Sequence, residues 1–149
     1  MKVLHINSEK SWRGGEQQMS SLMNLLRDEG VENHVLCRKD SEAANRLRDQ
    51  GFTVHEVGFS GLKFKASLKL KSLSDQFDII HTHTANAHTV AYYSAILGSQ
   101  TPIVVSKRTD FPVKSPKKFN HLKIVKILCV SKKIQEITQK DVIKPERVE

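Results

Sequence analysis

Short apolar runs alternate with amphipathic stretches along the whole chain, and this alternation limits the folds open to it more than any other feature. The runs predict six strands, at residues 2–6, 33–38, 53–57, 77–83, 103–106 and 124–130. Apolar residues follow one another in these runs, which is typical of strands that are buried on both faces of a parallel sheet.

Helical spacing fills the segments between the runs. Met19, Leu22, Met23 and Leu26 recur at intervals of three and four residues, and Gly30 then predicts the end of that helix. Further helices are predicted at 41–51, 62–77, 86–97 and 131–140. Residues 69–73 alternate as in a strand, but the spacing across 66–77 favours a helix. Right-handed crossovers then give an α/β fold: a doubly wound, mostly parallel Rossmann-like sheet with helices on both faces.

Size and composition exclude several classes of protein. A chain of 149 residues supports one domain, and 38% hydrophobic with 27% charged residues is ordinary for a globular protein. No window approaches the roughly 18 apolar residues of a membrane span, and no basic-then-apolar leader precedes the first strand. Cys37 and Cys129 lie in apolar runs and resemble buried thiols. We therefore expect a cytosolic, single-domain protein.

Positive charge gathers in the last third of the chain. Residues 107–149 carry 12 basic and 5 acidic side chains, within a net charge of +8 for the whole chain. Such a basic end indicates a solvated face or a surface that faces anions. Only Phe111 and Phe119 could stack on bases there, and no RNP-type motif is present, so nucleic acid is not an expected partner.

Four polar loops follow strands of the predicted sheet, at 7–16, 81–86, 106–112 and Ser131, and should share one crevice at its carboxyl edge. Gly14 and Gly15 open a helix, whose first N–H groups suit an anion such as a diphosphate. A tight turn would explain the same pair, because neither GxGxxG nor a Walker motif is present.

Histidine and arginine make two of these loops candidates for a ligand site. His81 and His83 are two residues apart and point to the same face, near Thr84 and Asn86. Zinc would need further Cys, His or carboxylate ligands, and only His88 follows nearby, so packing and hydrogen bonding are favoured over metal. Arg108 could hold a phosphate, or could pair with Asp110, and the sequence leaves both open.

Taken together, these loops resemble the N-terminal domain of the GT-B glycosyltransferases, specifically glycosyltransferase family 4. The matching segments, in order, are HINSEKSWRGGEQQ, DIIHTH, SKRTDF and ILCVS. The resemblance implies that 1–149 is one Rossmann-like half of a GT-B fold, and that the donor-binding C-terminal domain is absent from this chain.

The same resemblance implies a hexosyltransferase-type activity. A sugar would pass from a nucleotide-sugar donor to a saccharide or lipid-linked acceptor in cell-envelope polysaccharide or lipopolysaccharide synthesis, with no metal or other cofactor. Carried over by motif, His83 is catalytic and donor phosphates meet Gly14, Gly15 and Glu16. The residues implied in acceptor binding are His81, Asn86, Arg108 and Asp110. A stand-alone nucleotide- or phosphate-binding module is the alternative.

Two stretches, 62–71 and 114–126, mix lysine with apolar residues. Lysine stems could cover core helices there, or the stretches could rest on anionic lipid at the inner face of a membrane. The sequence supports both interpretations equally.

Overall fold

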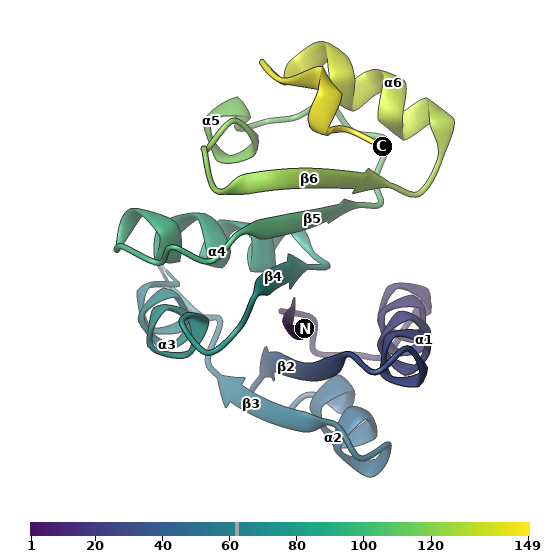
Figure 1. Ribbon diagram of the computed structural model, residues 1–149, viewed down its shortest axis with the longest axis vertical. Helices are drawn as coiled ribbons and strands as arrows, with labels where there is room; N and C mark the ends of the chain where they lie inside the picture. Colours follow the sequence, from purple (N-terminus) through teal and green to yellow (C-terminus); the bar gives the residue numbers. More distant parts are fainter. Residues whose placement is uncertain (62) are drawn as a thin grey trace.

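The computed structural model describes residues 1–61 and 63–149 and shows a parallel sheet with helices on both faces (Figure 1). Its strands are β1 (Lys2–Asn7), β2 (Glu32–Arg38), β3 (Thr53–Val57), β4 (Ile79–Thr82), β5 (Ile103–Lys107) and β6 (Ile124–Cys129). They lie in the order β3-β2-β1-β4-β5-β6, and every pair of neighbours is parallel. The doubly wound Rossmann-like fold and its six predicted strands are thus confirmed.

The helices connect these strands in the predicted way. They are α1 (Gly14–Asp28), α2 (Glu42–Asp49), α3 (Phe64–Ser74), α4 (Ala85–Ile96), α5 (Pro116–Phe119) and α6 (Lys132–Asp141), with a 3₁₀ turn η1 at Pro145–Arg147. The ambiguous segment is helical from Phe64, while Leu62, where the predicted helix began, lies outside the described residues. None of the described helices is both long and apolar enough to cross a membrane.

The short α5 and η1 were not predicted. Each has a proline in its first turn, where the missing N–H costs nothing because that group has no partner within the helix. Pro116 and Pro145 therefore carry a signal for a helix start.

The sheet has a separate apolar core on each face. Figure 1 shows α1 and α2 on one side and α3 and α4 on the other. Leu4, Ile6 and Ile80 belong to the core that includes α3 and α4 residues, whereas Val35 and Cys37 pack with residues of α1 and α2. Side chains alternate along a strand. The residues of β1 and β4 that lie between these therefore point to the opposite face of the sheet, which α1 covers. Cys37 is buried as expected, whereas Cys129 is only partly buried.

Side-chain caps start three of the helices directly after the preceding strand or turn. The hydroxyl oxygens of Ser41, Thr84 and Ser131 each accept a hydrogen bond from the backbone N–H three residues later. Thr84 follows β4 by only two residues, so the start of α4 lies at the carboxyl edge of the sheet. This edge is where ligands bind in folds of this kind.

The buried core predicts a graded response to the loss of one methyl group. Ile80 is 0% exposed at the centre of the sheet, whereas Ile143 is 79% exposed. Ile80→Val should lower the free energy of unfolding by about 1 kcal/mol, because it removes buried contacts and leaves a small cavity. Ile143→Val is the matched control and should change it by less than about 0.5 kcal/mol. Urea unfolding of both variants checks this, and equal effects would contradict the assigned core.

Candidate functional site

The loops after β1, β4 and β5 meet at the carboxyl edge of the sheet. The strand order reverses between β1 and β4, which opens a crevice at that edge. Ser8 and Thr84 share a hydrogen bond across it, with 2.6 Å between their hydroxyl oxygens. Three of the four predicted loops therefore converge, while the loop at Ser131 joins them through an ion pair between Lys133 and Asp110.

Arg108 ties two of these loops together. Its Nη1 donates to the carbonyl oxygen of Gly15 at 2.8 Å, and its Nη2 donates to Nδ1 of His83 at 2.9 Å. A Cβ at Gly15 would lie 3.0 Å from Nη1, so glycine at this position permits the close approach. Asp110 pairs with Lys133 at 3.2 Å, and no Arg108–Asp110 ion pair forms among the described residues. The alternative of a local ion pair after β5 is therefore wrong.

The glycine loop is shaped by Glu16. This buried carboxylate accepts hydrogen bonds from the side-chain amide of Asn7 at 2.9 Å and from the backbone N–H of Arg13 at 3.0 Å. Gly14 and Gly15 form the first turn of α1, where backbone N–H groups have no partner within the helix. The two glycines thus lie as expected for anion binding, and Glu16 holds their loop in place. Contact of these residues with a donor phosphate stays a prediction.

A directional row of hydrogen bonds runs from Arg108 across the sheet. A guanidinium only donates, so Nδ1 of His83 accepts and its neutral ring carries the proton on Nε2. That Nε2 donates to Nδ1 of His5 at 2.9 Å, and Nε2 of His5 then donates to Oδ1 of Asn33 at 3.0 Å. The row links the β5 loop with β4, β1 and β2. His5 was not predicted as a site residue, although a histidine inside the apolar run 2–6 was a visible signal.

His81 packs beside this row. It lies opposite His5 in the register of β4 and β1, its ring centroid is 4.1 Å from that of His83, and its Nε2 shares a hydrogen bond with Oγ of Ser106 at 2.8 Å. Burial lowers the pKa of His5 to about 4, and burial together with the neighbouring His5 and Arg108 lowers that of His81 to about 3. Burial and its charged neighbours also hold the pKa of His83 well below 6.5. All three rings are therefore neutral at pH 7.

Among the described residues, His5, His81 and His83 form a group that could hold a metal ion. Their potential ligand atoms lie within 4.8 Å of one another, a cluster that the spacing of His81, His83 and His88 did not predict. A bound ion would have to break the His5–His83 hydrogen bond and lie near the charge of Arg108. The residues therefore fit a hydrogen-bonded row better than a metal centre.

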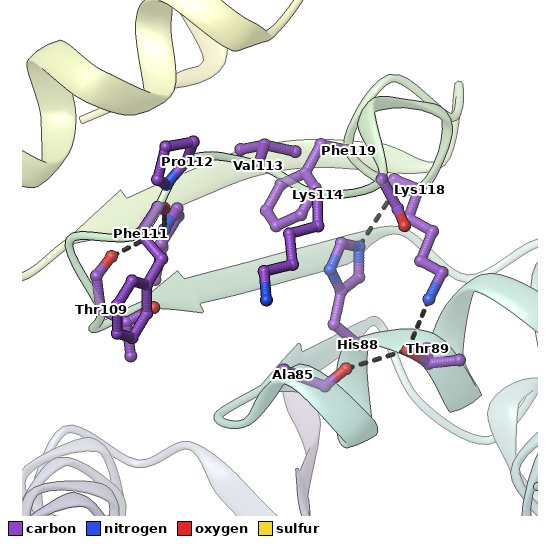
Figure 2. Close-up of a pocket in the computed structure, with 12 residues that line it drawn as sticks. Ala85, His88, Thr89, Thr109, Phe111, Pro112, Val113, Lys114, Lys118 and Phe119 are labelled. Carbon is purple, nitrogen blue, oxygen red and sulfur yellow. Dashed lines mark hydrogen bonds between the residues drawn. The ribbon is translucent and has the colours of Figure 1, made fainter.

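Two adjoining cavities open above the start of α4. The smaller, about 130 Å³, has His83, Thr84 and Arg108 in its wall. The larger, about 360 Å³, lies between α4 and the loop that leads to α5 (Figure 2). The two share Ala85, His88, Lys107, Thr109 and Phe119. The sequence singled out residues 106–112 of this loop, but it did not predict that residues 113–119 complete the wall of a cavity.

The residues expected to bind the acceptor do not all lie together in the structure. Arg108 lines the smaller cavity, and His81 is buried next to His83. Asn86 is exposed on the first turn of α4, and Asp110 is exposed and paired with Lys133. Only Arg108 and His83 among the predicted side chains come together in one wall.

The chain matches one family model and several solved structures of the same fold. The model of Glycosyltransferase Family 4 matches residues 12–149. The fold is similar to Anabaena HepE in complex with UDP-glucose (TM-score 0.82, 16% identity, 100% of this chain and 43% of that one). It is also similar to the lipopolysaccharide outer core galactosyltransferase WaaB (0.70, 16%, 100% and 44%) and to Acinetobacter baumannii MurG (0.62, 14%, 86% and 40%). The chain thus spans less than half the length of these structures. A search of curated protein sequences finds no match.

The buried histidines predict a loss of stability in acid. His5, His81 and His88 have folded-state pKa values of about 4, 3 and 4, below the 6.5 of an unfolded chain. The unfolded chain therefore takes up protons first, and the free energy of unfolding should fall as pH drops from about 6.5 toward 4. Each such histidine adds up to about 1.4 kcal/mol per pH unit to this slope.

Urea unfolding between pH 7 and 4.5 measures this slope. His81→Gln is compared with the parent chain once it is shown to be folded at pH 7. In His81→Gln the free energy of unfolding should fall less steeply with decreasing pH, because one fewer histidine takes up a proton on unfolding. A free energy of unfolding that stays constant across this range would contradict the assignment of these buried histidines as neutral.

Proposed function

The chain belongs to Glycosyltransferase Family 4, and on this premise we propose that it forms the acceptor-binding N-terminal domain of a hexosyltransferase. The enzyme would move a sugar from a nucleotide-sugar donor to a saccharide or lipid-linked acceptor in cell-envelope polysaccharide or lipopolysaccharide synthesis. HepE is solved with UDP-glucose, and WaaB is a lipopolysaccharide galactosyltransferase, which supports this class of donor and pathway for a chain of the same fold.

The contact of Arg108 with both Gly15 and His83 carries the proposal. It places the N-terminus of α1 and a neutral imidazole in one crevice, beside a cavity. The helix N-terminus and the guanidinium suit the diphosphate of a nucleotide-sugar. His83 lines the smaller cavity and its Nδ1 is an acceptor, so a substrate hydroxyl that replaces the guanidinium would find a hydrogen-bond partner there. We propose that the positive charge of this crevice suffices and that transfer requires no metal ion.

A second domain would complete the enzyme. The chain covers 43% and 44% of the length of HepE and WaaB. A molecule of comparable length would have a further part, which would close over the donor. The 149 residues should therefore fold alone yet transfer no sugar. Nucleotide-sugar turnover by the chain alone would contradict the two-domain proposal.

Substitution of His83 tests its proposed role in turnover. In the chain joined to its donor-binding domain, His83→Gln should lower kcat by about a hundredfold or more, as expected for a group that acts on the reacting atoms. His83 is buried between His5 and Arg108, so some stability is also lost, about 1–3 kcal/mol.

His5→Gln is the matched control, because it breaks the same row without lining the cavity. Equal loss of turnover in the two variants at matched folded fraction would assign His83 a structural role only.

We propose that the domain works in the cytoplasm, bound peripherally to the inner face of the membrane through α3. Phe64 is 57% and Leu68 is 42% exposed, and they lie four residues apart on the helix between exposed lysines. Such a face suits anionic lipid, each nearby lysine adding about 1 kcal/mol at low ionic strength. The stretch 114–126 fits less well, because Ile124 is buried and Phe119 packs against the core, although Leu122 and Val125 are exposed.

Liposome co-sedimentation tests the membrane contact. The chain should bind vesicles that contain anionic lipid, and binding should weaken with salt. Changing Lys63, Lys65, Lys69 and Lys71 to Gln should abolish it, whereas the charge-matched control with Lys39, Lys132, Lys140 and Lys144 changed to Gln should retain it. Equal binding to neutral vesicles, no binding at all, or equal loss in the control would leave the lysines as solvated residues.

A further inference from the structure

The larger cavity combines positive charge with an apolar wall. Its basic side chains are Lys107, Lys114 and Lys118, and no carboxylate is among the residues that line it. Phe111, Pro112, Val113 and Phe119 supply the apolar part. A cavity of about 360 Å³ with this lining suits a ligand that is anionic at one point and apolar beside it.

Two of the three lysines keep at least two N–H groups for a ligand. The ammonium of Lys118 donates to Oγ1 of Thr89 at 2.9 Å, which leaves two of its three donors. Lys114 has no hydrogen bond or ion pair with any part of the chain that the structure describes, and Figure 2 shows its side chain reaching into the cavity. Lys107 instead donates to the carbonyl oxygens of Thr109 and Phe111, at 2.7 and 2.8 Å, and so holds the loop.

No carboxylate forms a hydrogen bond or ion pair with the lysines of this cavity among the described residues. Burial and the neighbouring charge of Lys63 lower the pKa of Lys118, and burial lowers the pKa of Lys107. Their hydrogen-bond acceptors are uncharged oxygens. An anion placed between Lys114 and Lys118 would be attracted by both ammonium groups.

His88 and Phe119 give the cavity a fixed, neutral wall. Nε2 of His88 donates to the carbonyl oxygen of Lys118 at 3.1 Å, and the edge of one ring meets the face of the other with centroids 4.4 Å apart. Burial lowers the pKa of His88 to about 4, so at pH 7 its Nδ1 is an acceptor and the ring adds no charge. This wall can therefore hold a hydroxyl or an apolar group.

The cavity is continuous with the proposed reaction centre. It shares Lys107, His88 and Phe119 with the smaller cavity, whose wall contains His83 and Arg108. The glycine loop, which suits the donor diphosphate, lies on the β1 side of Arg108, whereas the lysines lie on the α5 side. A ligand that extends from His83 to the lysines would be the acceptor and not the donor.

We propose that the larger cavity binds a phosphate ester on the acceptor, held by Lys114 and Lys118 with its apolar substituent against Phe111 and Val113. This inference rests on the proposed function, since it names the chemical class of acceptor for the same crevice. Two point-charge donors suit the oxygens of a phosphate, and the apolar wall selects an ester over the free ion.

Titration of the ¹⁵N-labelled chain with hexyl phosphate tests the site without requiring turnover. Hexyl phosphate should shift the amide signals of Thr89, Val113 and Phe119, hexanol should shift them only weakly, and inorganic phosphate should bind less tightly than the ester. Lys114→Gln together with Lys118→Gln should weaken hexyl phosphate binding about tenfold, because hydrogen bonds to charged groups are among the stronger ones. Lys39→Gln together with Lys144→Gln, two exposed lysines elsewhere, should leave binding unchanged.

Thermal unfolding of each variant is recorded first. If the double variant does not fold, Lys114→Gln alone decides, because that side chain has no partner among the described residues to lose and should still weaken binding severalfold. Equal affinities for hexyl phosphate and hexanol, an unchanged affinity in the lysine variants, or an equal loss in the control would overturn the proposal. UDP that displaces hexyl phosphate from these signals would assign the cavity to the donor and also overturn it. Failure of sugar transfer by the two-domain enzyme, with binding intact, would instead count against the proposed function.

Discussion

The guanidinium of Arg108 sets the arrangement of the site, because it can only donate hydrogen bonds. Its bond to Nδ1 of His83 fixes the tautomer of that ring, which fixes the tautomer of His5, which in turn fixes how the amide of Asn33 is turned. Its second bond, to the carbonyl oxygen of Gly15, holds the start of α1 against the same point. Polar groups buried at the centre of a sheet are costly unless they are paired, and this row pairs them while it positions the crevice.

The sequence predicted the frame of the molecule well because the frame depends on local pattern. Apolar runs and helical spacing identified all six strands and the longer helices, and Gly30, which has a positive φ, marked the end of the first helix. Right-handed crossovers predicted the doubly wound arrangement, whereas the order of the strands came only from the structure. The missed α5 is a single turn, too short for any periodicity to show.

The site was predicted only in part, because its contacts join residues far apart in the chain. The sequence placed Arg108 and His83 in one crevice, but it could not show that Asp110 turns away to Lys133 or that Arg108 reaches back to Gly15. His5 and Asn33 lie in different strands, and the register places them diagonally, so that only their side-chain hydrogen bond joins them. The second wall of the cavities depends on a loop of irregular backbone, for which the sequence carries no periodic signal.

The directional row also has a consequence for how this site can diverge. Arg108, His83, His5 and Asn33 form a series in which each member accepts from the one before it. Replacing one member by a side chain of reversed polarity leaves two donors or two acceptors facing each other, and its neighbour must change as well. Substitutions at the four positions should therefore be coupled in related sequences. A sequence in which one member changes polarity should also change its neighbours in the row.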